Sequence, residues 1–262
     1  MDETPMYFDL VPGKTVDREG TKSVLIRTTG AEKRHITVVL AVAGSGDVLP
    51  PMIIFKGKRT LDLKAPKGWL IAVQEKAWMD ETLMLRWINE IYLPFTGRER
   101  SLLVMDSFRA HITDDVKKQL RRGNVVPAII PGGCTSKLQP LDVSINKPVK
   151  SYLRRSWMEY IRDATNALQS SDETSNGRIK TASKQIVLDW VINAMDTLKE
   201  KRAMIVKSFK VCGISVNLSG SENALIRNDN ELNTMDDDSD TEFEDFSPED
   251  LKMAMDKLLE TE

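Results

Sequence analysis

The order of apolar and polar positions along the chain predicts alternating strands and helices. Residues 35–43 are rich in β-branched side chains and almost continuously apolar, which is typical of a buried strand. Turn-forming residues 44–47 separate them from a second apolar run at residues 48–55, so the two runs predict a β-hairpin. Pro50 and Pro51 restrict the beginning of the second strand to an edge or a bulge.

Helices and two further strands are predicted downstream. The periodicity of residues 79–92 predicts a helix that Asp80 caps and Pro94 ends. Residues 114–122 predict a shorter helix with Thr113 as its N-cap. The other expected elements are strands at residues 102–105 and 124–130, amphipathic helices at residues 143–164, 185–198 and 202–212, an irregular segment at residues 1–32 and a polar loop at residues 163–184.

This element order indicates the α/β class, because strand–helix–strand connections favour parallel pairing. Ligand-binding groups in such sheets gather at the carboxyl ends of the strands. Asp106 directly follows the apolar run 102–105 and is therefore a candidate.

Composition excludes several classes of protein. Apolar residues make up 41% of 262 residues, which is enough for a sizeable core. No run approaches the roughly 20 apolar residues of a membrane span, and no secretory signal is visible. Cys134 and Cys212 lack the paired spacing of a zinc site or a disulfide framework, which fits a reducing compartment.

The net charge of −2 conceals a strong division along the chain. Residues 219–262 hold fifteen acidic and three basic residues, a net charge of −12, so the remainder carries +10. A basic body suggests a polyanionic partner, although a soluble surface with an acidic tail explains the division equally well. Within the tail, residues 228–246 are expected to be disordered, and residues 248–259 can form a short amphipathic helix. The tail is either a solvated spacer, a competitor for the basic body or a docking segment.

Three aspartates carry the candidate chemistry: Asp2, Asp106 and Asp142. Carboxylates on separate elements suit a two-metal site, in which ions about 3.5–4 Å apart clamp the attacking and leaving oxygens of a phosphoryl transfer. Each has an alternative explanation, since Asp106 can cap a turn, Asp142 can cap a helix and Asp2 lies at a chain end. His111 is interpreted as a hydrogen-bonding or surface residue rather than a metal ligand.

Seven short segments, in the right order, resemble the pogo/Tigger group of DDE transposases within the mariner-like superfamily. They are residues 1–5, 30–34, 49–57, 105–111, 134–142, 146–150 and 209–215. The resemblance covers about residues 1–220, and we take residues 1–218 as one domain and 219–262 as an acidic tail.

The resemblance implies a ribonuclease H-like mixed sheet flanked by helices, with Asp2, Asp106 and Asp142 as catalytic residues and ligands of Mg²⁺ or Mn²⁺. The implied reaction is metal-dependent nicking of DNA followed by strand transfer, in the nucleus, with no small-molecule substrate. Basic residues of the body would hold phosphates without identifying bases. A protein partner or dimerisation is left open.

Two family features are expected to be missing. The family's N-terminal helix-turn-helix modules do not precede Met1, and the first strand of the sheet is expected to lie before it as well. Three explanations compete: a fragment of a longer transposase, an inactive domesticated derivative, or replacement of the strand by another segment. The alternative function is therefore a catalytically inactive DNA-binding, regulatory or protein-interaction module.

Overall fold

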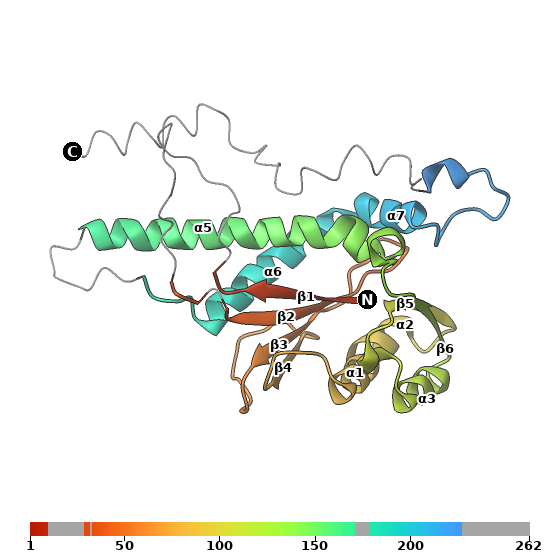
Figure 1. Ribbon diagram of the computed structural model, residues 1–262, viewed down its shortest axis with the longest axis horizontal. Helices are drawn as coiled ribbons and strands as arrows, with labels where there is room; N and C mark the ends of the chain where they lie inside the picture. Colours follow the sequence, from red (N-terminus) through yellow and green to blue (C-terminus); the bar gives the residue numbers. More distant parts are fainter. Residues whose placement is uncertain (10–28, 32, 171–178, 227–262) are drawn as a thin grey trace. The chain divides into compact units, whose positions relative to one another are not determined.

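The computed structural model describes residues 1–9, 29–31, 33–170 and 179–226 (Figure 1). All of them belong to one compact unit of the chain, Met1–Val11 and Leu25–Arg227. The predicted disordered stretch 228–246 and the predicted helix 248–259 lie outside the described residues, as does most of the segment expected to be irregular near the N-terminus. Among the described residues, no helix combines the length and apolar character needed to cross a membrane.

Six strands form two sheets. The first has the order β1(Asp2–Tyr7), β2(His35–Leu40), β3(Met52–Lys56) and β4(Leu70–Gln74). β2 is antiparallel to β1 and β3, which confirms the predicted hairpin, whereas β3 and β4 are parallel. The second sheet pairs β5(Ser101–Asp106) with β6(Val125–Ile130) in parallel, which confirms the pairing expected from the intervening helix.

The prediction that the sheet lacks its first strand is wrong, because the chain forms β1 directly from Asp2. β1 pairs with β2 along its whole length, from Asp2 opposite Leu40 to Tyr7 opposite His35. Pro5 is accommodated because β1 lies at the edge of the four-stranded sheet. The pairing joins residues more than twenty-five positions apart, so the local pattern of residues 1–7 does not reveal it.

The first helical region is longer than predicted. It comprises α1(Glu81–Trp87), a π-helical turn η1(Ile88–Tyr92) and α2(Leu93–Thr96). Asp80 caps α1 as expected, since its carboxylate accepts a hydrogen bond from Leu83 N. Pro94 does not end the helix. It lies in the first turn of α2, where a missing N–H costs little, and Gly97 ends the helix in a left-handed conformation.

The remaining helices follow the predicted order, although α5 continues beyond the expected end at residue 164. Thr113 caps α3 through Val116 N, as predicted. The elements are η2(Arg109–His111), α3(Asp114–Arg122), α4(Thr135–Leu138), the π-helical turn η3(Leu141–Ile145), α5(Asn146–Ser170), α6(Lys184–Glu200), α7(Arg202–Val211) and η4(Asn223–Leu225).

Helices cover both faces of the four-stranded sheet, because successive side chains of a strand point to opposite faces (Figure 1). Val39 and Met52 pack on one face in a cluster that includes Trp87 of α1. Val38 and Ile53 pack on the other face, in a cluster supplied by α5, α6 and α7. The molecule is therefore a mixed α/β structure. Its buried strands hold in place the strand ends at which the polar candidate residues lie.

A buried carboxylate connects α5 to the segment that follows β1. Asp9 is 4% exposed and accepts hydrogen bonds from Thr29 N, Thr29 Oγ1, Ala31 N and Trp157 Nε1. Since an ionised carboxylate only accepts hydrogen bonds, it suits a position surrounded by donors. Asp9 thus helps to hold α5 over the sheet.

Candidate metal centre

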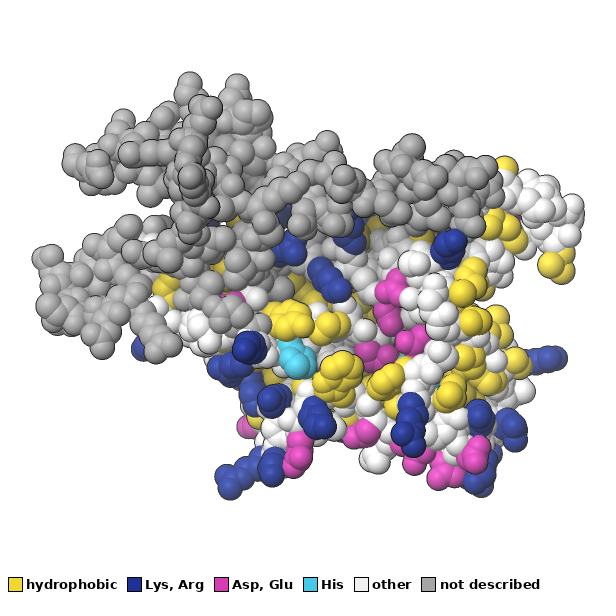
Figure 2. Space-filling model, viewed as in Figure 1, with side chains coloured by type: hydrophobic (Ala, Val, Ile, Leu, Met, Phe, Trp, Pro, Cys, Tyr) yellow, Lys and Arg dark blue, Asp and Glu magenta, His cyan; other side chains and the backbone are white. Residues whose placement is uncertain are grey.

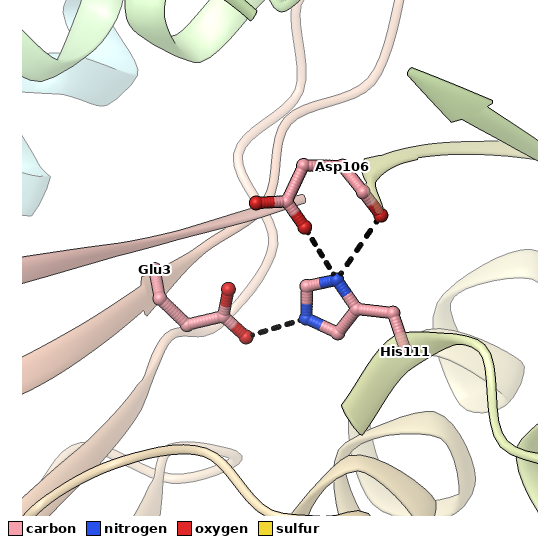
Figure 3. A group of neighbouring side chains, drawn as sticks. All are labelled: Glu3, Asp106 and His111. Carbon is pink, nitrogen blue, oxygen red and sulfur yellow. Dashed lines mark hydrogen bonds and ion pairs between the residues drawn. The ribbon is translucent and has the colours of Figure 1, made fainter. Parts of the chain in front are cut away.

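Asp106 stands at the carboxyl end of β5, where the chain leaves the sheet (Figure 3). Its Oδ1 accepts a hydrogen bond from Phe108 N at 3.0 Å and contacts His111 Nδ1 at 2.7 Å. The short helix η2 turns the chain back after β5 and brings His111 to this position. Burial tends to raise the pKa of Asp106, but the hydrogen bonds from His111 and Phe108 outweigh it and lower the pKa.

His111 joins Asp106 to β1. The side chain is buried, and its Nε2 lies 2.8 Å from Glu3 Oε1. Burial favours the neutral ring, yet the hydrogen bonds and charges of Asp106 and Glu3 prevail and raise the His111 pKa to about 9. The ring therefore carries a proton on both nitrogens at neutral pH and orients both carboxylates. The interpretation of His111 as a hydrogen-bonding residue agrees with these contacts.

Asp2 and Asp142 meet at a shared asparagine. Asn146 Nδ2 lies 2.7 Å from Asp2 Oδ2 and 2.9 Å from Asp142 Oδ1. Asp2 is 8% exposed, and its side chain lies on the face of β1 opposite to that of Glu3 because the two are adjacent in a strand. Desolvation raises the Asp2 pKa to about 7, although the bond from Asn146 opposes the shift and the charges of Asp142 and Glu3 add to it.

The start of β1 links the two groups. Met1 N donates to Val104 O of β5 at 2.8 Å, and Gln139 Nε2 donates to Met1 O at 3.3 Å. Burial lowers the pKa of the Met1 amino group, and the charges of Asp2, Glu3 and Asp106 oppose that shift. Acidic side chains from β1 and β5 therefore lie near the same amino group, and Asp142 is connected to these acidic side chains through Asp2.

Oxygen-rich side chains of this kind fit a hard divalent cation. Among the described residues, Glu3, Asp106 and His111 form a cluster in which one polar side-chain atom of each lies within 4.8 Å of the others, and the two carboxylates rather than the protonated His111 ring would bind a cation there. The three predicted aspartates are thus divided between two linked groups. Burial raises the Asp2 pKa most, and the charges of Asp142 and Glu3 raise it further, so a bound cation would offset both the desolvation and the repulsion of the Asp2 carboxylate.

Glu3 and Asn146 belong to the site but were not singled out from sequence. Both lie within segments that carry the family resemblance, which is the signal available without a structure. Their roles depend on partners 108 and 144 residues away, His111 and Asp2, so no local periodicity reveals them.

Comparison with known proteins identifies the family. The family model described as "DDE superfamily endonuclease" matches residues 33–209, which is more than half of the chain. This chain belongs to the DDE superfamily endonucleases. The DDE domain is also similar to the "Pogo transposable element with KRAB domain" proteins of Homo sapiens, at 36% identity over 88% of the chain, and of Mus musculus, at 35% over 88%.

A third relative of this DDE domain is the "Pogo transposable element with ZNF domain" of Homo sapiens, 29% identical over 87% of the chain. The chain is a pogo-type, transposase-derived domain, which confirms the resemblance inferred from its motifs. It spans 37% of the length of each KRAB-containing relative and 16% of the ZNF-containing one. No solved structure matches the chain.

Proposed function

We propose that this DDE domain binds DNA and hydrolyses a phosphodiester bond with the help of Mg²⁺ or Mn²⁺, the nicking step that precedes strand transfer. The observation that supports the proposal is the approach of Asp2 to Asp142 through Asn146, beside the group that holds Asp106. These carboxylates come from a strand, the end of another strand and a turn before a helix. Such a set suits metal-assisted phosphoryl transfer.

We also infer a ribonuclease H-like fold. Its support is the succession of antiparallel strands β1 to β3, followed by the parallel pair β5 and β6 with helices on both faces. In the fold that the resemblance implies, the first aspartate lies on the first strand, and the third lies at a later helix. Asp2 on β1 and Asp142 in the π-helical turn that leads into α5 are consistent with these positions.

In the proposed reaction, Asp2, Asp106 and Asp142 would hold the cations, and Glu3 lies beside them. Bound divalent cations lower the pKa of water and neutralise charge on the phosphate and the leaving oxygen. The protonated His111 ring fixes the directions of Asp106 and Glu3. Burial of Asp2 keeps bulk water from one side of the centre, which strengthens charge interactions there.

Basic side chains near the candidate metal centre suit contacts with a DNA backbone. Lys147, Lys150 and Arg155 lie on α5 within a few turns of Asp142, and all three are exposed. Figure 2 shows a small group of acidic side chains near the start of β1, with Lys and Arg side chains on either side of it. Such residues suit contacts with phosphates, and a DNA-acting domain of this family would work in the nucleus.

A nicking assay tests the proposal. The purified chain is incubated with supercoiled plasmid and Mg²⁺ or Mn²⁺, and open-circular product is measured. We expect metal-dependent nicking that disappears in Asp106→Asn, because the variant loses one ligand charge at the end of β5. Asp115→Asn, which changes an exposed aspartate of α3, should nick like the wild type.

Salt-sensitive DNA binding without nicking in either metal would contradict the catalytic proposal. It would support the alternative, a transposase-derived binding or regulatory module. Loss of both binding and nicking would contradict both.

A further inference from the structure

Asn146 has an unusual set of partners. The residue is 7% exposed, and its single Nδ2 atom donates to two carboxylates, at 2.7 Å to Asp2 and 2.9 Å to Asp142. An amide NH₂ has two hydrogens, so one nitrogen can serve both acceptors. Reversing the amide would set its oxygen against two carboxylates. The partners therefore determine the orientation of the side chain.

The backbone fixes where this amide lies. Asn146 is the first residue of α5, and its N–H bonds to Leu141 O across the π-helical turn η3. Asp142 and Asn146 are four residues apart and hence share one side of the helical path. Gln139, just before the turn, donates to Met1 O. The segment from Gln139 to Asn146 thus donates hydrogen bonds to two adjacent residues at the start of β1, Met1 and Asp2.

The amide oxygen of Asn146 provides a second observation, separate from the hydrogen bonds that the nitrogen donates. Asn146 Oδ1 is buried and has no hydrogen-bond partner among the residues that the structure describes. Natural proteins seldom leave a buried acceptor unpaired, and such an atom calls for an explanation by water, an ion or a ligand. Its position beside two carboxylates suits a donor such as a cation-bound water.

We propose that Asn146 is a positioning residue of the metal centre, which holds Asp2 and Asp142 in one relative arrangement so that both can bind the same cation. The proposal rests on the proposed function, since it assumes that these aspartates bind metal. Without the shared donor, two like charges would face each other with nothing between them and would turn apart. Groups that orient metal ligands commonly contribute 10- to 100-fold to affinity.

Mn²⁺ titration of the full 262-residue chain, followed by electron paramagnetic resonance, tests the proposal. We expect Asn146→Ala to weaken Mn²⁺ binding by about 10- to 100-fold. Asn146→Ser should lose a similar amount, because its short hydroxyl cannot reach both carboxylates. Asn193→Ala, which changes an exposed asparagine of α6, should bind like the wild type. Circular dichroism checks that each variant is folded.

A double-mutant cycle separates positioning from a merely structural role. If Asn146 acts through its carboxylate partners, Asn146→Ala should weaken Mn²⁺ binding less in an Asp142→Asn background than in the wild type. Additive losses, or wild-type affinity in both Asn146 variants, would overturn the proposal. If the wild type itself binds no Mn²⁺, or binds it equally in Asp106→Asn, the proposed function fails first, and the proposal for Asn146 falls with it.

Discussion

At the scale of single residues, Asp2 is a carboxylate whose ionisation works against folding. Its pKa rises from an ordinary value near 3.8 to about 7 in the folded chain, chiefly through desolvation. The folded state therefore binds a proton that the unfolded state releases, and stability falls as pH rises between these two values. Above pH 7 Asp2 is ionised in both the folded and the unfolded state, and the full unfavourable free energy of burying its charge opposes folding.

Replacing Asp2 with asparagine should consequently stabilise the metal-free protein at pH 8 by about 1–3 kcal/mol, raising the melting temperature by several degrees. The gain should shrink at pH 5 and vanish near pH 3, where Asp2 is protonated in both states. Thermal unfolding measured with a chelator present checks this. Mg²⁺ should then raise the melting temperature of the wild type more than that of Asp2→Asn, and equal shifts would count against Asp2 as a ligand.

The sequence alone identifies several residues of the candidate site but not how they are grouped in space. Asp106, Asp142 and His111 stand in recognisable segments, and Asp106 follows an apolar strand whose direction can be predicted. The division into an Asp106–His111–Glu3 group and an Asp2–Asn146–Asp142 group was inaccessible. It depends on which face of β1 each side chain occupies, and therefore on the register between Asp2 and Leu40.

At the scale of elements, the local signals that succeeded were caps and apolar runs. Asp80 and Thr113 cap helices as predicted because capping involves residues only three positions apart. Pro94 failed as a stop signal because the preceding π-helical turn places it at the beginning of a new helical segment. β4 was missed because it is a short strand added in parallel to β3, a pairing that local pattern does not encode.

Asp9 provides a test of how α5 is held over the sheet. Asp9→Ala leaves the donors of Thr29, Ala31 and Trp157 without their buried acceptor. We expect the free energy of unfolding to fall by about 3 kcal/mol and the melting temperature by about 10 °C. Asp163→Ala, at an exposed position on the same helix, should change the free energy by less than about 0.5 kcal/mol. Similar melting temperatures for the two variants would show that the Asp9 contacts contribute little.

At the scale of the whole molecule, charge separates the chain into parts of opposite sign. Truncation after Ile226 removes fourteen acidic and three basic residues and changes the net charge from −2 to +9. The shortened protein should bind duplex DNA more tightly at low salt, and the advantage should shrink as salt screens the charges. Fluorescence anisotropy with a labelled duplex measures both effects.

Truncation after Ser247 is the matched control, because it removes a net charge of only −3. It should have a smaller effect on DNA affinity than truncation after Ile226. Equal affinities for the full chain and the Ile226 truncation at low salt would exclude a role for the tail's charge. A large effect of the Ser247 truncation would point instead to the amphipathic segment beyond it.

The π-helical turn before α5 also has a consequence for the history of the gene. Asn146 N bonds to Leu141 O five residues back, whereas an α-helix would close that bond over four residues, with about 100° of rotation for each residue. Adding one codon between Asp142 and Asn146 would place them five residues apart, beyond the three- and four-residue spacings at which side chains on a helix are neighbours. An insertion there should mark a copy whose centre no longer assembles. Insertions between these two positions therefore offer a simple criterion for recognising decayed copies in genomic sequence.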